Sequence, residues 1–260
     1  MNIFIKRTFI LLFVVTQGCA TYGKISGIPS VGQKSLFKDG REVLISVEKS
    51  TVAIAPEMKI VKNGRRGNFI VAINNGTNQE IIFSTNDVTA YFKTNDEITS
   101  LKVFSYEELI AEEKKRQAWA AVGAALQGAA DSINAANAGY SRTYGTYSGS
   151  TYSGGIGLYS YGTYSGSTYN YAASQAARNA AQANSAARFA RLETEGQKNL
   201  SNLAAKILKK ETIFPGAWHG GIVKMELPPV SEIQQEIELI VNINGEKHKF
   251  RFTQEKIDNK

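Results

Sequence analysis

The residue with the clearest potential for covalent chemistry is Cys19, the only cysteine of the 260-residue chain. It closely follows an almost wholly apolar run, 8–15, which two cations, Lys6 and Arg7, precede. A membrane-spanning helix needs about 20 apolar residues, so this run is too short to be one. A cationic start followed by a short apolar core is typical of an export signal that is later removed. We therefore expect the chain to be cut at or near Cys19.

The four residues that end this segment, Thr16-Gln17-Gly18-Cys19, distinguish two kinds of processing. They resemble the lipobox of bacterial lipoproteins, Leu-small-Gly/Ala-Cys, in their last two positions, with Thr16 where Leu is usual and Gln17 where Ala or Ser is usual. The alternative is an ordinary secretory signal that is cut after Ala20, in which case Cys19 is discarded.

The resemblance to lipoproteins implies that residues 1–18 are a signal peptide and that Cys19 is acylated. Each buried methylene of an acyl chain contributes about 0.8 kcal/mol, so two or three chains would anchor the protein stably in a membrane. Gram-negative lipoproteins retained in the inner membrane carry Asp after the cysteine. Ala20 at this position therefore implies the outer membrane, and the mature chain would have no cysteine left for a disulfide.

The rest of the chain offers little catalytic chemistry. Its two histidines, His219 and His248, stand apart in the sequence, and a lone exposed histidine is seldom a metal ligand. No Gly-x-Ser-x-Gly or Ser-x-x-Lys pattern occurs in a suitable context. The basic turn 64–67 lacks the Lys-Ser/Thr pair and the helix of a phosphate-binding loop. We therefore expect no enzymatic activity, no cofactor and no metal.

A second candidate site is the tract 140–171, which contains nine of the twelve tyrosines. The nonapeptide Tyr-Gly-Thr-Tyr-Ser-Gly-Ser-Thr-Tyr occurs in it twice, at 144–152 and 161–169. Such a tract cannot bury a continuous apolar face, which favours a disordered loop. Tyrosines between Gly and Ser also suit contact with a protein partner, strand pairing between copies of the chain, or carbohydrate stacking. The candidate binding residues are Tyr144, Tyr147, Tyr152, Tyr161, Tyr164, Tyr169 and, in a separate turn, Trp218.

The formal charge of +7 is spread along the chain rather than concentrated in a basic patch. A mild positive excess favours solubility, with anionic glycans or lipid headgroups as secondary partners. Since the chain is expected to leave the cytoplasm, we expect no nucleic-acid partner.

The elements that position these candidates follow from hydrophobic periodicity. Alternating, β-rich segments separated by Asn/Gly turns predict an antiparallel β-sandwich whose two halves flank a helical region. Between Ala118 and Gly139 small residues dominate every face and the only charge is Asp131. This composition predicts two closely packed helices, with an oligomerisation or membrane-associating surface as the alternative. The predicted parts are a tether (19–40), two sandwich halves (41–104 and 211–254), a helical arm (105–139 and 172–210) and a low-complexity tip (140–171).

Three segments of the sandwich halves, 69–75, 212–216 and 220–223, resemble immunoglobulin-like domains of uncharacterised bacterial lipoproteins. The helix start 106–109 and the Ala/Tyr/Gly-rich insert are similar to a subgroup of unknown function. The resemblance implies an α+β protein: an antiparallel immunoglobulin-like β-sandwich interrupted by a long two-helix arm with a low-complexity tip. It implies no activity. We therefore expect an envelope scaffold or interaction protein, with a glycan- or peptidoglycan-binding module as the alternative.

Overall fold

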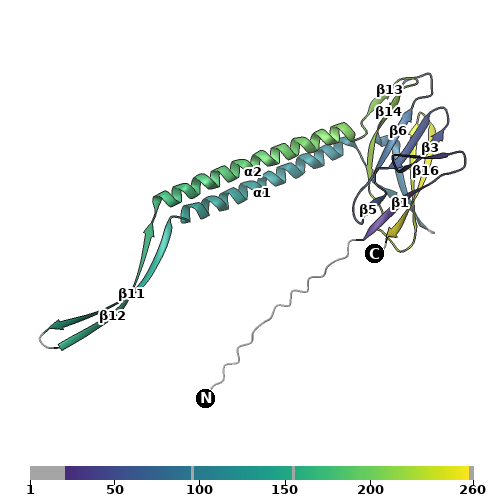
Figure 1. Ribbon diagram of the computed structural model, residues 1–260. Helices are drawn as coiled ribbons and strands as arrows, with labels where there is room; N and C mark the ends of the chain where they lie inside the picture. Colours follow the sequence, from purple (N-terminus) through teal and green to yellow (C-terminus); the bar gives the residue numbers. More distant parts are fainter. Residues whose placement is uncertain (1–20, 95–96, 154–155, 258–260) are drawn as a thin grey trace, which may run out of the picture. The chain divides into compact units, whose positions relative to one another are not determined.

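The computed structural model describes residues 21–94, 97–153 and 156–257, with the side chains of 151–158 excepted. Cys19 and the predicted signal peptide, 1–18, lie outside the described residues. The chain divides into two units (Figure 1). The sandwich unit contains the residues up to Ser105 and those from Ile207 onward, and the helical unit contains Tyr106–Lys206.

The sandwich unit is built from antiparallel strands in two six-stranded sheets and one small two-stranded sheet. The first sheet has the strand order β5 (Ile60–Lys62), β1 (Tyr22–Ile28), β16 (Glu246–Ile257), β15 (Gln235–Ile243), β8 (Val88–Lys93) and β9 (Ile98–Leu101). The second sheet has the order β10 (Val103–Phe104), β14 (Trp218–Met225), β6 (Gly67–Asn74), β4 (Thr51–Pro56), β3 (Arg41–Val47) and β2 (Lys34–Lys38). The small sheet pairs β7 (Ile81–Phe83) with β13 (Glu211–Ile213), and a 3-10 turn (Thr85–Asp87) precedes β8.

The inward faces of the two large sheets share one hydrophobic core, so they form a sandwich-like pair of layers. Along β6 every second residue is buried, as expected for a strand with one face in a core. Phe69 of the second sheet contacts Phe252 of the first, with ring centroids 5.0 Å apart. The fold is therefore α+β with an antiparallel sandwich-like body.

The strands before the helices pair directly with the strands after them. In the second sheet β6 pairs with β14, placing Ile70 opposite Ile222. In the first sheet β8 pairs with β15, placing Ala90 opposite Leu239. The helical unit is thus inserted into one continuous sandwich. The hairpin β15–β16 turns at Asn244 and Gly245, whose φ angles of 46° and 87° are those a tight two-residue turn needs.

The predicted tether over 19–40 is wrong for the part that the structure describes, because β1 and β2 occupy most of it. β1 pairs along its whole length with β16. Its glycines lie in a closely packed strand rather than in a flexible loop. A Cβ on Gly23 would lie 2.9 Å from the Val230 side chain, and one on Gly27 would lie 3.1 Å from Leu44. Glycine in a strand that needs such close approach has the same sequence signature as glycine in a spacer.

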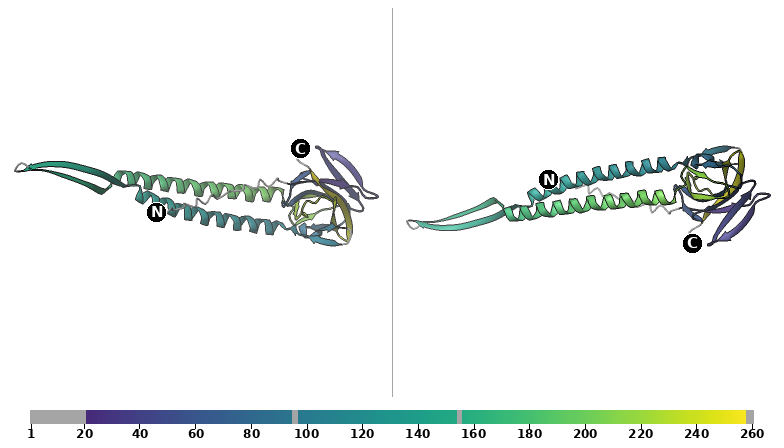
Figure 2. Two further views of the ribbon diagram at one scale, coloured as in Figure 1. Left: turned by 90° about the horizontal axis from the view of Figure 1, so that it is seen from below. Right: turned by 90° about the horizontal axis from the view of Figure 1, so that it is seen from above.

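The helical unit consists of α1 (Tyr106–Asn137), β11 (Tyr140–Ser153), β12 (Ile156–Tyr169) and α2 (Tyr171–Lys206). The two helices run side by side, and both views of Figure 2 show the strands β11 and β12 continuing from their ends. The helix predicted to reach residue 210 ends at Lys206. Beyond it, Ile207 forms a parallel bridge with Ile222, and Leu208 is fully buried in the sandwich core.

The disordered loop favoured for the tract 140–171 is wrong as well, because β11 and β12 pair over their full length. The pairing occurs within one chain. The alternation of tyrosine with small polar residues therefore acts as a strand pattern, although it encloses no core.

Candidate functional site

Small residues line the interface between α1 and α2. The buried positions include Ala124 and Ala135 on α1 and Ser174 and Gly196 on α2. The Ser174 hydroxyl donates a hydrogen bond to the Ala135 carbonyl at 3.4 Å. Because these side chains are short, the two helices approach closely, and their larger side chains lie outside this interface.

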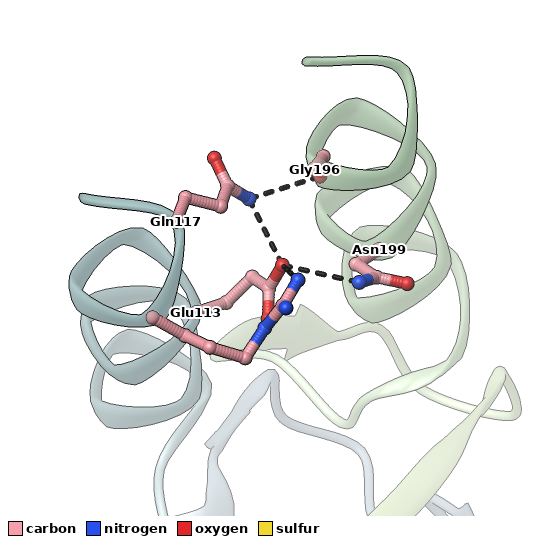
Figure 3. Close-up of polar contacts among 5 residues, drawn as sticks. Glu113, Gln117, Gly196 and Asn199 are labelled. Atoms are coloured by element: carbon pink, nitrogen blue, oxygen red, sulfur yellow. Dashed lines mark hydrogen bonds and ion pairs between the residues drawn. The ribbon is translucent and has the colours of Figure 1, made fainter. Parts of the chain in front are cut away.

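Four polar side chains near the start of α1 and the end of α2 form hydrogen bonds that connect the two helices (Figure 3). We call them the Glu113 cluster: Glu113, Arg116, Gln117 and Asn199. The Glu113 carboxylate accepts hydrogen bonds from Arg116 at 2.7 and 2.8 Å and from Gln117 at 2.9 Å. It also accepts one from Asn199 of α2 at 3.2 Å. The Gln117 amide donates a further bond to the Gly196 carbonyl at 3.1 Å, so two side chains of α1 bond directly to α2.

The hydrogen bond from Arg116 is the main cause of a low pKa for the Glu113 carboxyl, which falls from 4.5 to about 2. The amide donors Gln117 and Asn199 lower this pKa further, whereas burial opposes the shift. Glu113 in turn raises the pKa of Arg116. Glu113 is thus held as a carboxylate at the helix interface, as a structural ion pair requires.

Two further contacts hold the other end of the helix pair. Asp131 of α1 and Arg188 of α2 form an ion pair of 2.7 Å. Asn170 precedes α2, and its side-chain oxygen accepts a hydrogen bond from the Ala173 amide at 3.0 Å, which is the geometry of an N-cap. The Asn170 amide donates to the Gly139 carbonyl at 2.7 Å, so the cap also ties the two ends of the strand pair together.

An apolar seam runs along the exposed side of α1. Trp119, Val122, Leu126 and Ile133 are between 49% and 68% exposed. Their spacing of three, four and seven residues is that of the core positions of a coiled coil. Bulky apolar side chains with this periodicity usually face another helix, and α2 packs on the small-residue side instead.

The strand register pairs the two copies of the nonapeptide with each other. Thr146 lies opposite Thr163, which is its counterpart in the other copy. The segments 144–148 and 161–165, identical in sequence, therefore pair in opposite directions about a local two-fold axis. Gly145 faces Tyr164 and Tyr147 faces Gly162, which are equivalent contacts. A Cβ on either glycine would lie about 2.4 or 2.5 Å from the facing tyrosine ring, so the rings lie directly over the glycines.

The remaining tyrosines with described side chains gather on the opposite face of this strand pair. Alternation along the strands and the register place five of them together: Tyr140, Tyr144, Tyr159, Tyr161 and Tyr169. They are between 45% and 85% exposed, and the rings of Tyr140 and Tyr169 lie 4.7 Å apart. We call this surface the tyrosine face.

The structure brings three predicted binding residues, Tyr144, Tyr161 and Tyr169, to the tyrosine face. Tyr147 and Tyr164 lie on the other face, and the side chain of Tyr152 is outside the described set. Sequence reasoning missed the apolar seam and the contributions of Tyr140 and Tyr159. The heptad spacing from Trp119 to Ile133 is visible in the sequence. Which tyrosines share a face could be assigned only once the pairing register of β11 with β12 was known.

Trp218 lies apart from these residues, in the sandwich unit. It is the first residue of β14 rather than part of a turn, and it is 61% exposed. It lines a groove of about 480 Å³ on the second sheet, together with apolar and small residues of β2, β3, β4 and β6. Lys38, Asp39 and Arg41 also line this groove, which has the form of a small ligand site.

Both histidines differ from the exposed residues expected. His248 is fully buried, and the side chain of His219 is 16% exposed on β14. His248 lies close to Glu48 and Glu246, and one potential ligand atom from each lies within 4.8 Å of the others. The sequence separation of Glu48 from Glu246 hid this group from sequence analysis.

Among the described residues, neither long helix nor any shorter one has the length and apolarity needed to cross a membrane. No protein-family model, curated protein or solved structure matches this chain.

Proposed function

We propose that this protein is a non-enzymatic, lipid-anchored envelope protein whose helical unit binds further copies of the same chain. The observation that carries the proposal is the pairing of two identical peptide copies in β11 and β12. A segment that pairs with its own copy inside one chain has the right sequence to pair with another copy outside it.

The edges of the strand pair support this proposal. Within the described residues, β11 and β12 form a sheet of two strands only, so neither outer edge has a strand neighbour. An isolated two-stranded sheet is at best marginally stable in water, and a free edge is a template for strand addition. Natural proteins block such edges with charge, yet Arg142 is the only charged residue in 140–171.

The two exposed surfaces of the helical unit support the same conclusion. The tyrosine face offers a large aromatic area at low conformational cost, and the apolar seam has the period for helix–helix contact. Self-association would cover both, whereas a passive linker would leave them in water.

The test compares the mass of the full chain in mild detergent by sedimentation across a range of protein concentrations. We expect the wild type to self-associate. Replacing Tyr144 and Tyr161 together by Ser should weaken association at least about tenfold, since each removes aromatic contact area from the tyrosine face. Leu126→Lys should weaken it through the seam. Trp218→Ser, in the sandwich unit, is the matched control and should leave the mass unchanged. A wild type that stays monomeric at every concentration would refute self-association.

The alternative function, glycan or peptidoglycan binding, has its own support in the groove beside Trp218 and in the exposed tyrosines. Retention of the protein on purified peptidoglycan is the discriminating assay. If the Tyr144/Tyr161 or Trp218 variants lose retention while the mass stays unchanged, the alternative replaces self-association.

The lipid anchor at Cys19 and the outer-membrane location remain part of the proposal, supported by the sequence of the export segment. Intact mass of the N-terminal peptide, measured with and without an inhibitor of lipoprotein signal peptidase, tests the anchor. A peptide starting at Cys19 with added diacylglycerol and acyl mass is expected. A free N-terminus at Thr21 would instead indicate plain secretion. Membrane fractionation then assigns the membrane.

The finer fold assignment, an immunoglobulin-like domain, is also proposed. It is supported by two facing antiparallel sheets with a common core. An experimental structure that lacks the strand order of immunoglobulin domains would overturn it.

A further inference from the structure

Three side chains from different sheets of the sandwich unit meet at one end of β16. Glu48 lies in the turn between β3 and β4, which belong to the second sheet. Glu246 and His248 lie on β16 of the first sheet. One carboxylate oxygen of each glutamate and one ring nitrogen of the histidine lie within 4.8 Å of one another.

His248 is the unusual member of this group because it is fully buried, yet one of its ring nitrogens has no hydrogen-bond partner. Its Nδ1 lies 3.0 Å from the Ser46 hydroxyl. Its Nε2 points toward the Glu246 carboxylate at 3.5 Å, too far for a good hydrogen bond. A buried polar nitrogen without a hydrogen-bond partner is normally satisfied by a proton shared with a neighbouring carboxylate, by an ordered water or by a bound cation.

The separation of the two atoms suits a cation. A tetrahedral zinc ion with bonds of about 2.0–2.2 Å places its ligand atoms about 3.3–3.6 Å apart. The 3.5 Å between His248 Nε2 and the Glu246 oxygen falls in this range.

Backbone hydrogen bonds hold the Glu246 carboxylate, and the turn that carries Glu48, near that point. The Ser50 amide donates a hydrogen bond to Glu246 at 2.9 Å. The Glu48 amide donates to the Ser50 carbonyl, also at 2.9 Å, so the same turn holds Glu48 beside Glu246. Glu48 is exposed, which leaves its side chain free to complete the approach.

We propose that Glu48, Glu246 and His248 bind one divalent first-row transition-metal ion of the zinc type, with water as the remaining ligand. The two carboxylates balance the charge of the ion, and the imidazole favours such metals over Mg²⁺ or Ca²⁺. Ser46 supports the site by holding the other ring nitrogen of His248, as outer partners of metal-bound histidines do. The bound ion links the two sheets, and this proposal is independent of the function proposed for the helical unit.

The test is a Zn²⁺ titration of the full chain by calorimetry, in a Cys19→Ser background that removes the only thiol. One ion per chain is expected. Glu48→Gln should weaken binding at least about tenfold, because loss of a ligand costs at least as much as loss of an outer partner. Glu255→Gln, which changes an exposed carboxylate on the same strand, is the matched control and should bind Zn²⁺ like the parent. His248→Asn should also weaken binding, with circular dichroism used to verify its fold.

Two results would overturn the metal site. One is an absence of Zn²⁺ binding to the folded parent, which would make Glu246 and His248 a simple ion pair. The other is equal affinity in the parent and in Glu48→Gln, which would place the ion elsewhere. Co²⁺ provides a second readout, since its visible absorption should show a four-coordinate site in the parent and lose intensity in Glu48→Gln.

Discussion

Glu113 allows the energetics of the helix pair to be tested with one substitution and a change of pH. Its pKa is lowered from 4.5 to about 2, a shift of roughly 2.5 units, and each unit corresponds to about 1.36 kcal/mol. The full conversion would give about 3.4 kcal/mol. Because the Arg116 side chain is 51% exposed and water screens the pair, we expect about 1–2 kcal/mol.

The sign of the pH dependence follows from the direction of the shift. A carboxyl whose pKa is lower in the folded state stabilises that state fully above its unfolded pKa of 4.5. This contribution declines as the pH falls and is lost below about 2. Glu113→Gln should therefore destabilise the helical unit by about 1–2 kcal/mol near neutral pH and by close to zero at about pH 2.

The assay is denaturant unfolding of the wild type and Glu113→Gln, followed by the helical band of the far-ultraviolet circular dichroism spectrum. Glu193→Gln, an exposed carboxylate on α2, is the control and should change stability by less than about 0.5 kcal/mol at either pH. A destabilisation by Glu113→Gln that persists unchanged at low pH would show that packing, not charge, is responsible. No destabilisation near neutral pH would show that solvent screens the ion pair completely.

Two further substitutions test local geometry in each unit. Gly221→Ala should destabilise the sandwich unit by about 1–3 kcal/mol, since the added Cβ would lie 2.7 Å from the backbone of Leu208 and would displace that fully buried side chain. Calorimetric unfolding measures this, and a neutral effect would mean that the backbone after α2 is not held against β14. Asn170→Ala should cost the helical unit about 1 kcal/mol because the N-cap of α2 is lost. Asn170→Asp keeps the acceptor and should retain most of the stability; equal losses in both variants would contradict the capping role.

The sequence predicted the strands and helices whose pattern is local. The alternation in 69–73 and the Asn244-Gly245 dipeptide fixed β6 and the β15–β16 turn, and the change of period after Phe104 located α1. Prediction from sequence failed where one residue pattern is compatible with both a loop and a strand. Gly23 and Gly27 permit close packing in β1 but look like spacer residues, and a Gly/Ser/Tyr tract can pair without enclosing a core.

The candidate sites likewise differ in whether a local sequence pattern could reveal them. The apolar seam is a local pattern on one helix and could have been found from the spacing of Trp119, Val122 and Leu126. The tyrosine face depends on which residues oppose each other across the strand pair, which no local pattern determines. The group of Glu48, Glu246 and His248 depends on two sheets meeting, and nearly 200 residues separate its members along the chain.

The early start of β1 has a consequence for how copies of this chain would meet. Strand β1 begins at Tyr22, so an acylated Cys19 would leave only Ala20 and Thr21 before a strand that is paired on both sides. Three residues reach at most about 11 Å, only a few ångströms more than the roughly 5–8 Å depth of one lipid headgroup layer. Such a short connection to the membrane would restrict tilting and tumbling of the sandwich unit at the bilayer surface. Neighbouring chains would diffuse in a plane with part of their orientational entropy already lost, so the same contacts would hold them together more tightly on a membrane than in solution.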